Sequence, residues 1–219
     1  MIDTLMFTRR TFIGGAAGLS GIISSTGCHS AAAPFPTMET LSGRMPCGSC
    51  AQPAVLSWRT SITGPNEPGQ PIQVSGVIYR EEDHRPAEGA ILFVFQTDAS
   101  GRYNRDVSGY RGEVNPRLRG WMKTGSDGRY EFSSIKPGQY SGPIHIHAHL
   151  YAAGRPEWFI REFLFADDRL IPPRERAEFA RYGRFSPMLH LRPRGDGVLV
   201  AERDILMTRD PRRPWPPAA

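Results

Sequence analysis

The 219-residue sequence has no long apolar run and few lysines and cysteines. Without a stretch of about 18 consecutive apolar residues, it does not fit a protein with several membrane-spanning helices. The 27 cationic residues include only two lysines, Lys123 and Lys136, and the arginines are scattered among acidic residues. A nucleic-acid-binding surface needs clustered positive charge, so the net charge of +5 does not predict a nucleic-acid partner.

The first thirty residues resemble an export signal. The pair Arg9-Arg10 precedes Phe12 and a glycine-rich apolar stretch that ends near Ile23, as in a twin-arginine signal. This stretch is too short to be a stable membrane anchor. An ordinary secretory peptide or a short buried helix is the alternative. We expect an exported protein, periplasmic or extracellular, with residues 1–30 as its signal.

The three cysteines stand near the N-terminus. Cys28 follows three small residues, as a lipid-carrying cysteine does, but the leucine usual three positions earlier is missing. Membrane anchoring through a lipid on Cys28 therefore stays open. Cys47 and Cys50 form a single CxxC pair. In an oxidising compartment this pair favours a local disulfide, with a redox or metal half-site as the alternative.

The composition changes near residue 70. Residues 31–69 are rich in Pro, Ser, Gly and Thr, which predicts a linker or an extended arm over the domain. Residues 70–208 are predicted to form one domain, followed by a Pro/Arg-rich tail at 209–219. Short runs rich in β-branched and aromatic residues, separated by turn signals, predict strands within the domain. The predicted strands are 74–79, 90–96, 129–134, 144–151, 158–165 and 198–206.

Helical signals are confined to one segment. Prolines stand in the first turn of residues 172–182, and Gly183 follows the end, which predicts a short helix. The similar segments 97–103 and 124–130 each place a glycine at a tight position, which predicts two hairpins. The predicted fold class is therefore all-β, an antiparallel β-sandwich with long loops and one short helix.

Three of the six histidines alternate along one predicted strand: His145, His147 and His149. Alternate side chains of a strand point to the same face, so two of these imidazoles are well placed to bind one metal ion. A lone histidine is more often a surface or hydrogen-bonded residue. A triplet beside the turn sequence that ends at Tyr140 favours a metal site.

The nearby tyrosines narrow the choice of metal. Zinc prefers His, Cys and carboxylate ligands, and Fe(II) oxygenases use two His and one carboxylate, whereas neither HxD nor HxE follows here. A phenol has an ordinary pKa of about 10. A hard, highly charged cation is needed to hold it deprotonated at neutral pH, which favours Fe(III) with His and Tyr ligands.

These motifs resemble the intradiol ring-cleavage dioxygenases, the family of protocatechuate 3,4-dioxygenase and catechol 1,2-dioxygenase. The strongest part of the resemblance is Pro137-Gly138-Gln139-Tyr140 followed by His145-Ile146-His147. The resemblance covers about residues 70–206 and is most similar to exported members of the family. Its other motifs lie at 76–77, 89–90, 95–98, 101–103, 119–121, 127–132 and 163–168.

The resemblance implies an Fe(III) site with two tyrosinates and two histidines. Carried over by position, the ligands are Tyr140, His145 and His147, with Tyr110 at the spacing expected after the Gly-Arg-Tyr turn. Tyr103, within that turn, is expected to pack in the core. The implied substrates are a catechol-type aromatic diol and O2, with ring cleavage between the hydroxyl-bearing carbons giving a muconate-type diacid. Tyr140 is the implied catalytic ligand, displaced when substrate binds.

The sequence departs from the family pattern at several positions. Gly142 stands where well-studied members carry an arginine, and Arg161-Glu162 replaces a usual Thr-Gln pair. We therefore expect Arg119 or Arg161 to supply positive charge near the substrate. His149 is additional, and a role behind the ligands or at the surface is expected for it.

Two alternatives to an active enzyme follow from these departures. One is an exported β-sandwich binding or accessory module of the same fold without turnover. The other, a zinc-dependent hydrolase, is disfavoured by the tyrosines and by the missing carboxylate ligand. The sequence also leaves open whether the chain forms a homo-oligomer.

Overall fold

The computed structural model describes residues 52–105, 116–153 and 158–208. The predicted signal, the three cysteines, Tyr110 and the C-terminal tail lie outside these ranges. The elements, in chain order, are β1 (Arg59–Ser61), β2 (Pro71–Arg80), β3 (Ile91–Gln96), β4 (Leu118–Lys123), β5 (Arg129–Ile135), β6 (His145–Tyr151), β7 (Trp158–Phe159), β8 (Phe163–Phe165), α3 (Pro173–Ala180), the 3-10 turn η2 (Gly183–Phe185), β9 (Met188–Leu189), β10 (Arg192–Pro193), β11 (Leu199–Glu202) and β12 (Ile205–Met207).

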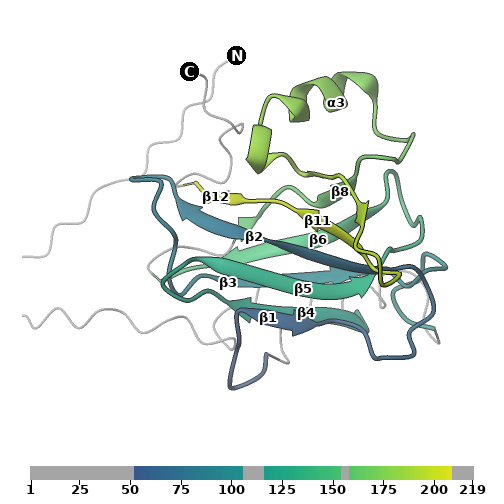
Figure 1. The fold of residues 1–219 in the computed structure, drawn as a ribbon, viewed down its shortest axis with the longest axis horizontal. Coiled ribbons are helices and arrows are strands. Elements are labelled where there is room, and N and C mark those ends of the chain that lie inside the picture. Colours follow the sequence, from purple (N-terminus) through teal and green to yellow (C-terminus); the bar gives the residue numbers. More distant parts are fainter. Residues whose placement is uncertain (1–51, 106–115, 154–157, 209–219) are drawn as a thin grey trace, which may run out of the picture. The chain divides into compact units, whose positions relative to one another are not determined.

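The strands form two sheets that face each other (Figure 1). The first has the order β1-β5-β2-β11-β10, with β12 also paired to β2. The second has the order β4-β3-β6-β8-β9, with β7 also paired to β6. The predicted all-β sandwich with one short helix is confirmed. Most pairs are antiparallel, whereas β1–β5, β2–β11, β2–β12 and β8–β9 are parallel.

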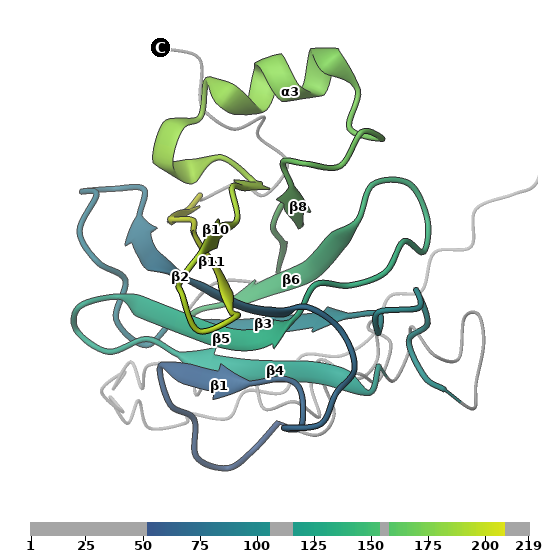
Figure 2. The same cartoon turned by 45° about the vertical axis from the view of Figure 1, so that its right-hand side comes forward.

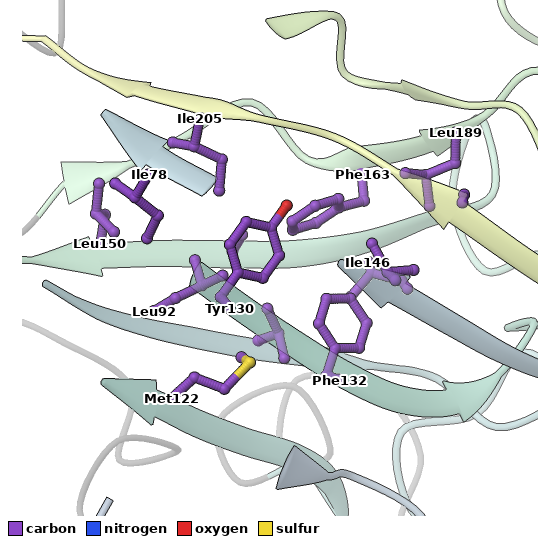
Figure 3. Close-up of a cluster of buried hydrophobic side chains, with 14 of the residues drawn as sticks. Ile78, Leu92, Met122, Tyr130, Phe132, Ile146, Leu150, Phe163, Leu189 and Ile205 are labelled. Atoms are coloured by element: carbon purple, nitrogen blue, oxygen red, sulfur yellow. The ribbon is translucent and has the colours of Figure 1, made fainter. Parts of the chain in front are cut away.

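The core lies between the two sheets because the strands alternate in polarity. On β2, the alternating residues Ile72, Val74 and Ile78 are apolar and face inward, and on β6 the inward set begins at Ile146. Burial of each large apolar side chain contributes roughly 1.5–3 kcal/mol to folding. Figure 3 shows the centre of this cluster, which includes Ile78, Leu92, Met122, Tyr130, Phe132, Ile146, Leu150, Phe163, Leu189 and Ile205.

The single helix α3 matches the predicted segment 172–182, with Pro173 in its first turn. Its buried residue Phe179 packs in a second, smaller cluster with Leu164, Ile171 and Met188. Figure 2 shows α3 on the side of β8, away from β1 and β4. No helix in the described part of the chain is long and apolar enough to cross a membrane.

Residues 57–62 join the two sheets at one edge, although this stretch was predicted to belong to an arm. The carbonyl of Ser57 accepts a hydrogen bond from Lys123 in β4 (2.9 Å), and that of Trp58 accepts one from Glu131 in β5 (3.0 Å). Ile62 packs directly over Gly120, where any side chain would collide with it. The stretch thus contributes β1 to the first sheet and contacts the second.

One of the two hairpin predictions is confirmed and the other is wrong. Residues 97–103 follow β3, and β3 pairs antiparallel with the next strand, β4, as a hairpin requires. Residues 124–130 connect β4 in the second sheet to β5 in the first, so the hairpin prediction there is wrong. The turn is nonetheless tight: Gly128 has φ +67° and donates to the carbonyl of Gly125 (3.0 Å). Turn chemistry reverses the chain locally but does not decide which sheet the next strand joins.

Candidate metal centre

The three alternating histidines project from β6 on the face of the second sheet opposite the core. The register of the sheet places His147 beside Phe95 of β3, and Phe95 beside Arg119 of β4. His147 stacks on the ring of Phe95 with 4.7 Å between ring centroids. The residues that alternate with the histidines are buried in the core, which fixes the histidine face: Ile146, Ala148 and Leu150.

His145 and His147 present their Nε2 atoms to each other at 3.0 Å. Nδ1 of His145 lies 2.6 Å from the carbonyl of Pro143 and donates its hydrogen there. This bond leaves the lone pair of the His145 imidazole on Nε2, the usual arrangement of a metal-binding histidine. Two nitrogen donors at right angles on one ion, each about 2.1 Å from it, lie about 3 Å apart. The observed spacing matches that geometry.

His147 is neutral at physiological pH. Burial, together with its neighbours His145 and His149, lowers the pKa of His147 to about 3. A neutral imidazole keeps the lone pair that a metal ion needs.

Tyr103 places a phenol beside the imidazole of His147. Its side chain is buried, as expected, but it does more than pack: the hydroxyl lies 2.9 Å from Nε2 of His147. The ring of Tyr140 meets that of Tyr103 edge-to-face, with centroids 5.1 Å apart. Tyr140 is 43% exposed. One buried and one accessible phenol therefore flank the two imidazoles.

Two glycines hold together the turns that carry these tyrosines. Gly101 has φ +79°, and a side chain there would collide with the carbonyl of Gln139. A side chain at Gly138 would likewise collide with the backbone of Gly101 and Ala99. The N–H of Gly138 donates to the carbonyl of Asp98 (2.8 Å). The backbones of the Gly-Arg-Tyr and Pro-Gly-Gln-Tyr turns thus touch directly, which fixes the two phenols relative to each other.

Asp98 stabilises the first of these turns. Its Oδ1 accepts hydrogen bonds from the N–H of Ser100 (2.9 Å), the hydroxyl of Ser100 (2.7 Å) and the N–H of Arg102 (3.1 Å). Burial alone would raise the pKa of this carboxyl, but these hydrogen bonds outweigh it and lower the pKa. Asp98 therefore stays ionised and fixes the backbone just before Tyr103.

Comparison with known proteins agrees with this arrangement. Residues 56–185, more than half of the chain, match the model of the family described as Dioxygenase. Similar proteins and solved structures include protocatechuate, catechol and hydroxyquinol dioxygenases and an enzyme named for intradiol ring cleavage. The chain belongs to the intradiol ring-cleaving dioxygenase family.

Two curated relatives illustrate the match. The protocatechuate 3,4-dioxygenase beta chain of Burkholderia cepacia is 29% identical over 113 residues, 47% of this chain and 48% of the relative. The 6-chlorohydroxyquinol 1,2-dioxygenase of Cupriavidus pinatubonensis is 37% identical over 92 residues, 41% of this chain and 32% of the relative. The chain thus spans about half or less of the length of these relatives.

Solved structures share the fold. The dioxygenase domain of a carbohydrate-binding fusion from Streptomyces sp. SirexAA-E has a TM-score of 0.53 and 25% identity, with 72% of this chain and 92% of that domain covered. The intradiol ring-cleavage dioxygenase from Tetranychus urticae has a TM-score of 0.52 and 21% identity, with 74% and 90% covered. Catechol 1,2-dioxygenase from Acinetobacter sp. ADP1 has a TM-score of 0.53 and 17% identity, with 72% and 59% covered.

Intradiol dioxygenases use Fe(III), and the donors found here suit that ion. The part of the chain that the structure describes contains no group of three or more His, Cys, Asp or Glu side chains that could hold a metal. The described residues therefore do not form a metal site built from those residue types alone. Two imidazoles together with phenols form a donor set that suits Fe(III) better than zinc.

The remaining predicted site residues are dispersed. Arg119 lies one strand beyond Phe95, with its Cζ 5.9 Å from the ring of Trp121. Arg161 is exposed and lies over the ring of Phe179 in the second cluster, at 5.4 Å. His149 is buried and meets the rings of Phe93 and Phe95 edge-on, so of the two roles expected for it the one at the surface is wrong and the one behind the ligands stays a prediction.

Tyr103 and Asp98 are the residues of this site that the sequence did not reveal. Their motif, Gly-Arg-Tyr after an Asp turn, was visible, but the hydroxyl contact depends on the pairing of β3 with β6. Tyr110, Cys47 and Cys50 lie outside the described residues, so their predicted roles stay predictions.

Proposed function

We propose that this chain is an exported Fe(III) dioxygenase that uses O2 to cleave a catechol-type ring between its hydroxyl-bearing carbons, giving a muconate-type diacid. The observation that carries the proposal is the convergence of Tyr103, His145 and His147 within hydrogen-bonding distance, with Tyr140 at their side. Family membership supplies the reaction class, and the donor set supports the ion.

We assign three ligands to Tyr140, His145 and His147, and we propose Tyr103, whose hydroxyl contacts His147, for the second tyrosinate. Tyr110, the ligand that the resemblance implies, lies outside the described residues and stays the other candidate. Ferric iron held there would act as a Lewis acid toward a chelating catecholate. His147 stays a neutral donor because burial lowers its pKa to about 3, and the Nδ1–H of His145 is held by the carbonyl of Pro143. Buried Tyr103 keeps its place through the Asp98 turn.

Tyr140 is the residue suited to move a proton. Its ring is the more exposed of the two phenols, so it has room to swing away when a substrate arrives. Its phenolate oxygen is then a base for a substrate hydroxyl proton.

Arg119 is the better placed of the two candidate cations. Its side chain shares a cross-strand row with Phe95 and His147, and burial lowers the pKa of its guanidinium. Among the described residues no carboxylate pairs with Arg119, whose Nη1 donates to the carbonyl of Pro116 (2.5 Å). A cation without a described carboxylate partner, in the same cross-strand row as His147, favours an anionic aromatic ligand.

Purification of the iron-loaded protein tests the proposal. We expect about one ferric ion per chain, a wine-red tyrosinate-to-iron absorption that shifts when catechol is added under nitrogen, and oxygen uptake with a diacid product. A colourless protein that binds no ferric iron would refute the proposal. Colour and catechol binding without oxygen uptake across a catechol panel would instead identify the binding module without turnover, which Gly142 at the usual arginine position favours.

Export is supported by the Arg9-Arg10 pair and the short apolar stretch after it. Replacing both arginines with lysine should retain the full-length precursor in the cytoplasm if the twin-arginine route is used. Mass spectrometry of the mature N-terminus would show whether Cys28 is its first residue and carries lipid. Unchanged export of the double variant would point to the ordinary secretory route.

A further inference from the structure

The segment after β8 reaches back to the start of the histidine strand. The carboxylate of Asp168 accepts two backbone hydrogen bonds, one on each oxygen. Oδ2 accepts from the N–H of Ile144 (2.5 Å), and Oδ1 accepts from the N–H of Leu170 (2.9 Å). Ile144 immediately precedes His145, the first residue of β6.

The N–H of Ile144 and the carbonyl of Pro143 belong to one peptide group. The carbonyl side of that group accepts the hydrogen of Nδ1 of His145 (2.6 Å), while the N–H side is held by Asp168. A peptide group is planar, so fixing the N–H fixes the direction of the carbonyl. The three groups form one continuous chain from carboxylate through peptide to imidazole.

The chain just before this peptide group is open. Gly142 has φ +64° and an added Cβ would meet nothing within 4 Å, and residues 140–142 are exposed. The side chain of Ile144 packs against the core, but apolar packing does not set the direction of its N–H. The bond to Asp168 supplies that direction.

The helix α3 holds Asp168 in turn. The guanidinium of Arg176 donates to the carbonyl of Ala166 (2.6 Å), to that of Ile171 (3.2 Å) and to that of Asp168 itself. Phe179, one turn further along α3, is buried in the second cluster. The only described helix thereby fixes the loop that carries the carboxylate.

We propose that Asp168 is a positioning residue for His145: through the Pro143–Ile144 peptide it fixes the imidazole with Nε2 unprotonated and aimed at His147. The proposal rests on the proposed function, because it assigns the purpose of that orientation to ferric iron. A carboxylate behind a metal-binding histidine raises the donor strength of the ring. Here a peptide group stands between them, and hydrogen bonds in such chains reinforce one another.

Asp168→Asn and Asp167→Asn make a matched pair. Both remove one negative charge at neighbouring positions. In Asp168→Asn one carboxylate oxygen becomes an NH2 donor and the charge is lost, so the N–H groups of Ile144 and Leu170 no longer each have an anionic oxygen of their own and both bonds are weakened or lost. Asp167 is 65% exposed on its side chain and pairs with Lys136 (2.6 Å), and the described contacts do not link it to the Pro143–Ile144 peptide.

The first readout uses the iron-free protein. Amide exchange of Ile144 and the nitrogen-15 shifts of the His145 ring report the bond and the tautomer directly. With Asp168→Asn we expect Ile144 to exchange at least about tenfold faster and His145 to populate both tautomers. With Asp167→Asn both signals should match the parent. If Asp168→Asn does not fold, Asp168→Glu, which keeps the charge but displaces the carboxylate, should give the same two changes.

The second readout is the affinity for ferric iron, added as its nitrilotriacetate complex. We expect a loss of roughly 10–100-fold for Asp168→Asn, with a shifted tyrosinate absorption, and less than about twofold for Asp167→Asn. Equal affinities in the two variants, or an unchanged His145 tautomer in Asp168→Asn, would overturn the proposal. If the parent protein itself binds no ferric iron, the proposed function fails, and the tautomer and exchange data alone decide whether Asp168 orients His145.

Discussion

The phenolic oxygen of Tyr103 lies 2.9 Å from Nε2 of His147, although the two residues are 44 positions apart in the chain. Tyr103 ends the turn that follows β3, and His147 lies within β6, the strand hydrogen-bonded to β3. The register that places Phe95 opposite His147 leaves Tyr103 just beyond the strand end, facing the same imidazole. Sheet pairing, and not sequence proximity, assembles this half of the site.

The contact predicts which tyrosine is the second phenolate. Tyr103→Phe should remove or strongly shift the tyrosinate-to-iron absorption and weaken ferric iron binding, because the phenol beside His147 is lost. Tyr110→Phe is the matched control and should leave the spectrum unchanged. Absorption spectra of the two iron-loaded variants decide the matter: the opposite pattern would restore Tyr110 as the ligand.

Because the two tyrosine-bearing turns touch at Gly101, replacing Gly101 with alanine should destabilise the fold more than replacing Gly142 does. Gly101→Ala should lower the free energy of unfolding by roughly 3 kcal/mol, since left-handed backbone strain adds to a collision with the carbonyl of Gln139. Gly142→Ala, also at positive φ but in open space, should cost about 1 kcal/mol. Urea unfolding of both variants measures the difference, and equal losses would show that the turns are not in firm contact.

Glu67 should make the free energy of unfolding depend on pH in the acidic range. Its side chain is 7% exposed and pairs with Arg117 at 2.6 Å, and hydrogen bonding to that guanidinium lowers the pKa of Glu67 below its ordinary value. The stabilisation is then complete above the unfolded-state pKa of about 4.3 and is lost as the pH falls through the lower folded-state value.

Glu67→Gln should therefore be less stable than the parent by about 1–2 kcal/mol at pH 7 and nearly equal to it at an acidic pH below both the folded-state and the unfolded-state pKa of Glu67. Chemical unfolding at the two pH values measures this. Asp83→Asn, which removes a solvent-exposed partner of Arg80, serves as control and should show no measurable change at either pH. A deficit of Glu67→Gln that persists at the acidic pH would assign the effect to packing.

Tyr130 should behave as a structural tyrosine. Its hydroxyl donates to the carbonyl of Arg203 (2.5 Å) inside the core, and burial raises its pKa, so it remains protonated. Tyr130→Phe leaves that carbonyl without this donor and should lower the free energy of unfolding by about 1–2 kcal/mol. Thermal unfolding and the iron absorption, measured together, should show a lower Tm with an unchanged spectrum. A change in the spectrum would contradict the assignment.

The sequence predicted most strands because a strand repeats every two residues. The alternation of apolar and polar residues in β2 and β6 could be read from the sequence alone, and the same alternation placed His145 and His147 on one face. β4, in contrast, reads LRGWMK, with a central glycine and cations at positions 2 and 6. That pattern resembles a loop, and only pairing with β3 and the close packing of Ile62 on Gly120 explain it.

The parts of the site that could not be predicted are those that depend on contacts between distant segments. The hydroxyl contact of Tyr103 and the peptide bond held by Asp168 both cross between strands or loops. The split of residues 158–165 into β7 and β8 has the same cause, because each half pairs with a different stretch of β6. Local periodicity contains no information about such partners.

Glu67 also closes the base of the connection between Tyr103 and β4. It pairs with Arg117 on one side and lies 3.7 Å from Arg105 on the other, while the N–H of Arg117 donates to the carbonyl of Tyr103 (3.3 Å). The two described ends of the connection, Tyr103 and Arg117, are thereby held to each other and to Glu67. An acidic residue far from the imidazoles in the sequence thus helps to keep the phenol of Tyr103 in place beside His147.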